Sequence, residues 1–364
     1  MRLQKKQIKN IFGVCTLAII NLSLFASGCG SKNEINWNNN WREQVRFVGG
    51  SELYGEEVDL KWTNMGIEFQ FNGTEVWAEM SSVCVEEKND EALIGIFVDD
   101  MATVYQTVVV SGTPKQYVLA SELSDRQHTV RISKLTEYRD SEVYIGSVGI
   151  KGNDMKPTCP KDKLILFIGD SITTGYGVMA NEPDSPYIVS EEDGSKTYAY
   201  ILANKLQYDT IFVCRRGIGV LANADGSEMK IREMYQNYSS ENVNADIVCI
   251  NIGTNDEKQI LKNKEKEQRF TEEYIELLKL VRQTNPNAQI VALYGAMTTE
   301  FVEKIKMSVE QYRDLTGDEK IYFYKFKNSI YEMENGVASG HPSQTAHTIF
   351  ADELIEYILE KIDK

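Results

Sequence analysis

Histidine is scarce in this sequence, and the cysteine spacings that bind zinc are missing. Three histidines occur in 364 residues, so few imidazoles are available as a catalytic base. Two of the six cysteines, Cys15 and Cys29, lie near the N-terminus. The others show no CxxC pair and no cysteine–histidine spacing, so we expect no zinc site, and no disulfide pairing is favoured. They are Cys84, Cys159, Cys214 and Cys249.

Positive charge is also in deficit. The chain has 39 Lys and Arg against 54 Asp and Glu, a formal net charge of -15. Such an acidic chain is a poor candidate for holding nucleic acid or an anionic membrane surface by charge. A neutral substrate such as a sugar raises no such difficulty. The apolar share of 42% is typical of a globular protein, and 364 residues are enough for two domains.

The N-terminal segment has the pattern of an export signal. A positive head precedes an apolar stretch at residues 11–26, which is short for a bilayer span. Small residues then lead to Cys29, in a pattern that resembles a bacterial lipobox. Residues 1–28 are predicted as a signal peptide and the asparagine-rich residues 29–45 as a tether. Either a lipid on Cys29 anchors an extracellular protein to the cell surface, or ordinary signal peptidase releases it.

Residues 46–152 carry the pattern of an all-β domain. Short runs with period-two alternation, rich in β-branched and aromatic residues, recur with turn signals between them. Residues 66–71 and 74–80 are two such runs, and Asn72 with Gly73 is interpreted as the turn that separates them. The spacing predicts an antiparallel sandwich of the jelly-roll type.

A change of pattern follows residues 151–162, which are the best candidate for a linker. From residue 161 to 364, apolar runs typical of strands covered on both faces alternate with helical patterns. Strands are predicted at residues 164–168, 210–213, 247–250, 290–294 and 321–324, and helices at 198–206, 270–282 and 346–362. This predicts a parallel α/β sheet, whose ligands bind beyond the carboxyl ends of the strands.

Candidate chemical groups follow these strands. Ser171 comes straight after the first strand, next to a glycine-bounded turn that leaves its hydroxyl free at the sheet edge. Gly217 follows the second strand and Asn255 the third, and both can offer an N–H to an oxyanion. His341 lies in a loop before the last helix, free to reach the serine. His128 in a predicted β strand and His347 at the last helix are expected to be structural.

These blocks, in this order, resemble the motifs of the SGNH (GDSL-type) hydrolases over about residues 163–364. They are GDSIT at 169–173, a glycine at 217, GTND at 253–256 and HPS at 341–343. The N-terminal half adds FQFNGT at 69–74, VDD at 98–100, HTVR at 128–131 and KLTE at 134–137. With these segments the chain resembles carbohydrate esterase family 2 over about residues 43–364.

The resemblance implies a flavodoxin-like SGNH domain behind a jelly-roll sandwich. It also implies an esterase that removes acetyl groups from polysaccharides such as acetylxylan or glucomannan, with no metal or organic cofactor. Ser171 would be the nucleophile and His341 the general base. The N–H groups of Ser171 and Gly217 and the side-chain amide of Asn255 would form the oxyanion hole, with Gly219 as the alternative to Gly217.

The acid that usually orients the catalytic histidine is missing. SGNH enzymes commonly place an aspartate two or three residues before it, where this sequence has Ser339 and Ala338. A backbone carbonyl could hold the ring instead, which gives a dyad, or Glu332 or Glu334 could substitute. The departure also leaves open a weakened or inactive hydrolase that binds carbohydrate.

A polar and acidic loop at residues 178–196 is expected to wall the site. Within it, Tyr187 is the candidate for stacking on a sugar ring. A lipid or thioester hydrolase of the wider SGNH group, the remaining alternative, would have a more apolar approach to Ser171.

Mass spectrometry of the mature protein tests the lipoprotein prediction. The expected result is an N-terminal diacylglyceryl-cysteine at Cys29. A free N-terminus at a neighbouring small residue would instead indicate ordinary signal-peptidase cleavage. An uncleaved N-terminus would contradict the cleaved signal peptide and indicate a membrane anchor.

Overall fold

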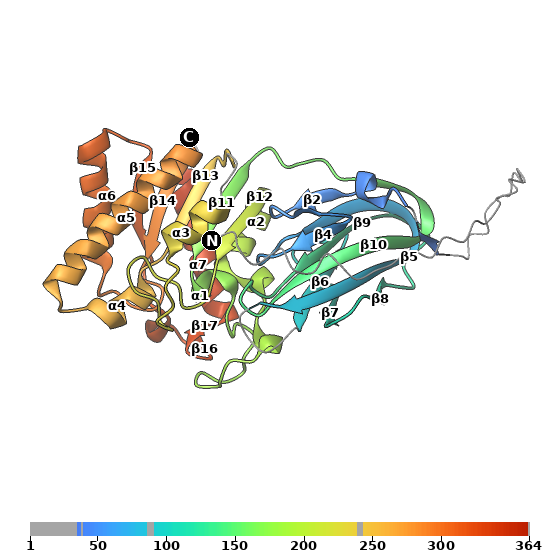
Figure 1. Ribbon diagram of the computed structural model, residues 1–364, viewed down its shortest axis with the longest axis horizontal. Helices are drawn as coiled ribbons and strands as arrows, with labels where there is room; N and C mark the ends of the chain where they lie inside the picture. The colour runs from blue at the N-terminus through green and yellow to red at the C-terminus, as the bar shows by residue number, and fades with distance from the viewer. Residues whose placement is uncertain (1–34, 38, 86–90, 239–242, 363–364) are drawn as a thin grey trace, which may run out of the picture. The chain divides into compact units, whose positions relative to one another are not determined.

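The computed structural model describes residues 35–37, 39–85, 91–238 and 243–362. The predicted signal peptide and Cys29 lie outside these residues. Within them, an antiparallel β domain precedes a domain with a five-stranded parallel sheet (Figure 1). The predicted fold class is therefore confirmed. Among the described residues, no helix is both long enough and apolar enough to cross a membrane.

Two long strands organise the β domain. β5 (Gly66–Cys84) and β10 (Ser141–Pro157) pair antiparallel along most of their length. β9 (Arg126–Lys134) pairs with the first half of β5 and β8 (Lys115–Ala120) with the second half. The shorter strands are β1 (Asn36–Trp37), β2 (Arg46–Val48), β3 (Glu52–Tyr54), β4 (Glu57–Leu60), β6 (Ala92–Val98) and β7 (Gln106–Val110).

Asn72 and Gly73 do not form the predicted turn, because both lie inside β5. A Cβ on Gly73 would lie 2.2 Å from the carbonyl oxygen of Lys151, and one on Gly152 would lie 2.0 Å from that of Asn72. The register between β5 and β10 shifts at this point. The two glycines therefore allow a close approach at a β-bulge within a continuous strand.

Part of the predicted tether belongs to the β domain. Asn36 in β1 pairs with Ile150 of β10. The short helix η1 (Trp41–Gln44) places Trp41 in the core, where it is 2% exposed. The domain thus begins at Asn36 rather than at residue 46, and β10 extends into the predicted linker as far as Pro157.

The parallel sheet has the strand order β12-β11-β13-β14-β15. Its strands are β11 (Leu164–Gly169), β12 (Asp209–Cys214), β13 (Ile247–Asn251), β14 (Gln289–Tyr294) and β15 (Ile321–Lys325). All five predicted strands are confirmed with small differences at their ends. This flavodoxin-like order has its switch point at β11, between β12 and β13, where doubly wound sheets bind their ligands.

Helices cover both faces of the parallel sheet (Figure 1). Ile165 and Phe167 of β11 pack into one cluster of buried side chains, and Leu166 and Ile168 pack into the other, because alternate strand residues point to opposite faces. The first cluster includes α2 (Tyr198–Leu206), α7 (Gln344–Tyr357) and η5 (Ile358–Ile362), and the second α3 (Ile231–Tyr238), α5 (Lys264–Thr284) and α6 (Val302–Thr316). The remaining elements are α1 (Ser171–Thr174), η2 (Val189–Glu191), η3 (Gly194–Lys196), α4 (Thr254–Ile260), η4 (Ile330–Glu332), β16 (Val337–Ala338) and β17 (His341–Pro342).

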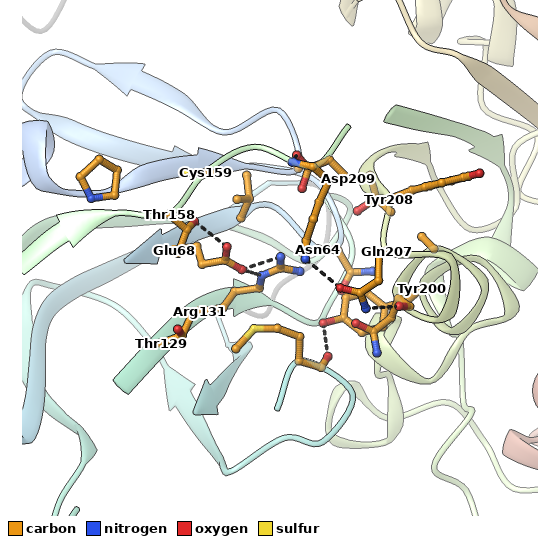
Figure 2. A pocket seen from close by; sticks show the side chains of 18 of the residues that line it. Asn64, Glu68, Thr129, Arg131, Thr158, Cys159, Tyr200, Gln207, Tyr208 and Asp209 are labelled. Carbon is orange, nitrogen blue, oxygen red and sulfur yellow. Dashed lines mark hydrogen bonds and ion pairs between the residues drawn. The ribbon is translucent and has the colours of Figure 1, made fainter. Parts of the chain in front are cut away.

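A partly buried ionic cluster links the β domain to the first residue of β12. Arg46 donates to Glu68 and to Asp209, both at 2.7 Å. Arg131 pairs with the other oxygen of Glu68 at 2.6 Å (Figure 2). We call these four residues the Glu68 cluster. A pocket of about 770 Å³ lies beside the cluster and contains none of the predicted site residues.

Trp41→Ala tests whether residues 36–45 belong to the fold. The substitution leaves a cavity in the β-domain core and is expected to lower the free energy of unfolding by about 3–5 kcal/mol, measured by urea unfolding. The control is Tyr54→Ala, at a side chain 57% exposed, where a change of about 0.5 kcal/mol or less is expected. An equally small effect of Trp41→Ala would restore the tether interpretation.

Candidate active site

The structure brings Ser171 and His341 together at the carboxyl end of the parallel sheet. Ser171 begins α1 directly after β11, and His341 begins β17. These two elements are neighbours in space (Figure 1). His341 Nε2 lies 2.9 Å from Ser171 Oγ, although 170 positions separate the two residues. This distance suits a serine hydroxyl and its base.

A backbone carbonyl orients the imidazole. The carbonyl oxygen of Ser339 lies 3.1 Å from His341 Nδ1. Because a carbonyl only accepts hydrogen bonds, Nδ1 carries the hydrogen and Nε2 is left to accept the proton of Ser171. The alternative through Glu332 or Glu334 is wrong. Glu332 instead accepts from the N–H of Ser329 at 2.7 Å, and Glu334 is exposed.

The carbonyl of Ser339 is itself held in place by the loop that was expected to wall the site. The N–H and Oγ of Ser339 donate to the carbonyls of Glu182 at 3.0 Å and Ser185 at 2.8 Å. The N–H of Gly340 donates to Pro183 O at 2.6 Å. Ser339 has a φ of +49°, a left-handed conformation that residues with side chains adopt at a cost. These hydrogen bonds stabilise it and aim the carbonyl at the histidine.

The surroundings of His341 keep its imidazole neutral. Burial, with a smaller contribution from Lys258, lowers the pKa of His341 to about 4, against the opposing effect of the hydrogen bond to the Ser339 carbonyl. The ring of Tyr176 packs against the imidazole with the ring centroids 4.2 Å apart. A neutral imidazole accepts a proton at physiological pH, so His341 is suited to act as a base.

Asn255 connects the two backbone segments that carry the predicted oxyanion donors. Its side-chain amide donates to Ile218 O at 2.8 Å and lies 3.4 Å from Asp170 Oδ2. These two groups flank Gly217 and Ser171 in the chain, so the three predicted donors are gathered at one place. In the part of the chain that the structure describes, the N–H groups of Ser171 and Gly217 donate to no acceptor of the protein. Both are therefore available to a substrate oxygen.

Gly217, rather than Gly219, has the N–H available. Gly217 has a φ of +75°, which favours glycine. The N–H of Gly219 instead donates to Asn223 Oδ1 at 2.9 Å. The geometry thus favours Gly217 over Gly219 as the oxyanion donor.

Asp256, the last residue of GTND, fixes the loop that follows Gly219. Its carboxylate accepts three backbone N–H groups, at 2.8, 2.6 and 2.7 Å. The donors are Val220, Leu221 and Ala222. Burial raises the pKa of Asp256 to about 6. The GTND motif alone did not indicate that Asp256 holds this loop.

Tyr187 is not free to stack on a sugar, so that prediction is wrong. One face of its ring stacks on Tyr176 with centroids 4.3 Å apart, and Arg216 lies over the ring at 4.7 Å. Its hydroxyl lies 2.8 Å from Asp140 Oδ2 and 2.9 Å from Glu192 Oε2. One hydroxyl proton cannot serve both carboxylates, and burial together with the nearby charges of Glu137 and Asp140 raises the pKa of Glu192, which favours its protonated form.

The other two histidines have the structural places that were predicted. His128 Nδ1 lies 2.9 Å from Asp99, and its Nε2 lies 2.8 Å from Ser124 O. His347 is buried in α7 and accepts the N–H of Tyr198 at 3.1 Å. Over the described ranges, no group of three or more His, Cys, Asp or Glu side chains is arranged to hold a metal ion.

Comparisons with known proteins agree with this geometry. A model of the GDSL-like lipase/acylhydrolase family matches residues 167–349, and a model of the carbohydrate esterase 2 N-terminal domain matches residues 51–158. Fold and site define an ester hydrolase whose serine follows the first strand of a parallel sheet. The chain belongs to the GDSL-like lipase/acylhydrolase family, and its N-terminal part matches the N-terminal domain of carbohydrate esterase family 2.

Relatives cover nearly all of the described chain. The cellulase/esterase CelE of Acetivibrio thermocellus is 26% identical over 83% of this chain, which spans only 37% of CelE. An acetylxylan esterase/glucomannan deacetylase of Cellvibrio japonicus is 22% identical over 82% of this chain and 87% of its own length. A family two carbohydrate esterase from Clostridium thermocellum, solved in complex with cellohexaose, has a TM-score of 0.78 at 24% identity and covers 88% of this chain and 99% of its own. The acetyl xylan esterase Est2A of Butyrivibrio proteoclasticus has a TM-score of 0.79 at 20% identity, over 91% of this chain and 98% of its own.

The pH dependence of kcat/KM tests the state of His341. Because protonation removes the base, activity is expected to fall only as the pH drops toward about 4, the lowered pKa of His341. If His341 had the pKa of an ordinary histidine, kcat/KM would already fall to half at about pH 6.5. The profile is measured with a soluble acetyl ester, with melting temperature followed at each pH as a control. An acid limb near pH 6.5 in folded enzyme would contradict the lowered pKa of the carbonyl-held imidazole.

Proposed function

We propose that this esterase removes acetyl groups from an acetylated polysaccharide, of the acetylxylan or glucomannan type, through an acetyl-enzyme on Ser171. The observation that carries the proposal is the hydrogen bond between Ser171 and a correctly oriented His341, placed at the switch point of the sheet. The relatives support the substrate class, since one is named an acetylxylan esterase/glucomannan deacetylase and another was solved with cellohexaose.

The arrangement accounts for each step of such a reaction. Ser171 Oγ attacks the acetyl carbonyl carbon while His341 Nε2 takes the hydroxyl proton. The N–H groups of Ser171 and Gly217 stabilise the oxyanion of the tetrahedral intermediate. The amide of Asn255 is a third donor once its long 3.4 Å contact with Asp170 Oδ2 is given up. The carbon–oxygen bond to the sugar then breaks, and the sugar oxygen leaves with the proton from His341. Water attacks the acetyl-enzyme by the same route and releases acetate and the free serine.

Two other functions were open from the sequence. A carbohydrate-binding protein with an inactive site was motivated by the missing aspartate, and the Ser339 carbonyl now supplies an acceptor for His341 Nδ1. A lipid or thioester hydrolase would favour an apolar approach to the serine. Instead, the neighbouring loop contains Glu182 and Asp184, which are both exposed. The acetyl esterase is the function that these observations support best.

For the location of the enzyme, we propose the outer cell surface, with a lipid anchor on Cys29. The support is the sequence pattern of residues 1–29 alone. An acidic enzyme tethered outside the cell would meet neutral polysaccharide without electrostatic cost.

Acetate release from acetylated xylan, acetylated glucomannan and 4-nitrophenyl acetate tests the proposed function. The wild type is expected to release acetate from at least one polysaccharide. Ser171→Ala removes the nucleophile and should reduce kcat by about 10⁴-fold or more. Ser190→Ala is the matched control, because this serine lies in the neighbouring loop and is exposed, and its activity should be unchanged.

The outcomes separate the three functions. Release from polysaccharide that disappears in Ser171→Ala supports the proposal. Release from 4-nitrophenyl acetate and long-chain esters but not from polysaccharide would favour the lipid hydrolase. Folded wild type that is inactive on every ester but is retained on a polysaccharide column would favour the binding protein.

A further inference from the structure

We propose that the β domain is part of the catalytic machinery, because Glu137 and Asp140 position the oxyanion donor Gly217 through its neighbour Arg216. These two acids lie in the connection between β9 and β10, so they come from the other domain. The inference rests on the proposed function, since it assigns positioning residues to the same reaction.

The first contact fixes the backbone beside the donor. The N–H of Arg216 donates to Glu137 Oε2 at 2.6 Å, and Glu137 is fully buried. Arg216 directly precedes Gly217, so the Arg216 carbonyl and the Gly217 N–H share one planar peptide group. Holding Arg216 therefore limits how far the Gly217 N–H can move from the oxyanion position.

The second contact fixes the side chain of Arg216. Its guanidinium donates to both carboxylate oxygens of Asp140, at 2.7 and 2.8 Å, and lies 2.7 Å from Glu137 Oε1. A paired fork of this kind fixes the orientation of both partners as well as their distance. Glu137 and Asp140 thus bind both the backbone and the side chain of Arg216.

The acidic pair is held rigidly within its own connection. Lys134, which is fully buried, donates from Nζ to the carbonyls of Thr136 at 2.8 Å and Glu137 at 2.7 Å. The N–H of Glu137 donates to Glu192 Oε2 at 3.2 Å. A positioning residue has to be fixed by its surroundings, and these contacts meet that requirement. They also give the KLTE segment at 134–137 a role that the sequence did not suggest.

The Glu68 cluster also joins the two domains, so the Glu137 and Asp140 contacts are not needed for that purpose alone. It reaches the hydrolase domain at Asp209, the first residue of β12, whereas Arg216 follows the last residue of that strand. Ser171 lies at the carboxyl end of the sheet, so of these two sets of contacts those of Glu137 and Asp140 are the ones that reach the oxyanion end. Asp209 therefore supplies a matched control at the other end of the same strand.

Kinetics with 4-nitrophenyl acetate test the proposal, with Glu137→Gln and Asp140→Asn as the variants and Asp209→Asn as the control. Each variant is expected to lower kcat by about 10- to 100-fold at nearly unchanged KM, because misplacing an oxyanion donor weakens transition-state binding alone. Asp209→Asn should leave kcat within about threefold, although it also removes an ion pair between the two domains. Equal kcat losses in all three variants, or a loss through KM alone, would overturn the proposal.

A second measurement does not depend on activity. In ¹⁵N-labelled protein, Glu137→Gln is expected to shift the Gly217 amide resonance and to speed hydrogen exchange of the Arg216 amide, which donates to Glu137, while Asp209→Asn leaves both unchanged. An unmoved Gly217 amide in folded Glu137→Gln would overturn the proposal, and Asp140→Asn serves if Glu137→Gln does not fold. Wild type that hydrolyses no ester would refute the proposed function, whereas this amide measurement would still decide the positioning role.

Discussion

The hydrogen bond from His341 to the carbonyl of Ser339 is the interaction on which the site depends. It selects the tautomer in which Nε2 faces Ser171, a task that a carboxylate performs in triads. A carbonyl carries no full charge, so it stabilises an imidazolium less than a carboxylate does. The site compensates by geometry, since Ser339 is held in a left-handed conformation by a loop that packs over it.

Burial is the second constraint, and it acts in two directions. It lowers the pKa of His341, which keeps the base neutral, and it raises the pKa of Glu192. Near Tyr187 it also forces the remaining charges to pair. Arg216 pairs with Asp140 and Glu137, because a buried guanidinium without partners would lower the stability of the fold by about 3–5 kcal/mol. The oxyanion loop is therefore tied to the β domain by the need to neutralise buried charge.

The sequence was a reliable guide where one segment alone determines the outcome. β11 is buried on both faces, so every residue from 165 to 168 is apolar, and the run identifies the strand. The serine, glycine, asparagine and histidine follow strands or precede the last helix, and the sheet brings them to one edge. The order of these blocks and the family resemblance they carry predicted the pair of Ser171 and His341, but left open whether a backbone carbonyl or a glutamate orients the imidazole.

Predictions failed where the outcome depends on distant partners. Gly73 looks like a turn glycine, but it serves the close approach of β10, almost eighty positions away. Trp41 lies in a polar segment, and only the assembled core shows that it is buried. Tyr187 is an aromatic residue in a loop beside the site, as a sugar-stacking residue would be, yet Tyr176 and Arg216 cover its ring. Glu137 and Asp140 were missed because their partner Arg216 lies 79 and 76 residues away.

Mass spectrometry of rapidly quenched enzyme tests the central claim, acyl transfer by a Ser171–His341 dyad. With 4-nitrophenyl acetate at saturation, we predict one acetyl group, located on Ser171, in the wild type. His341→Ala should show almost none on the same timescale, because the serine loses its base. Acetyl-free wild type during turnover, or acetylation of Ser171 at an equal rate in His341→Ala, would contradict the dyad.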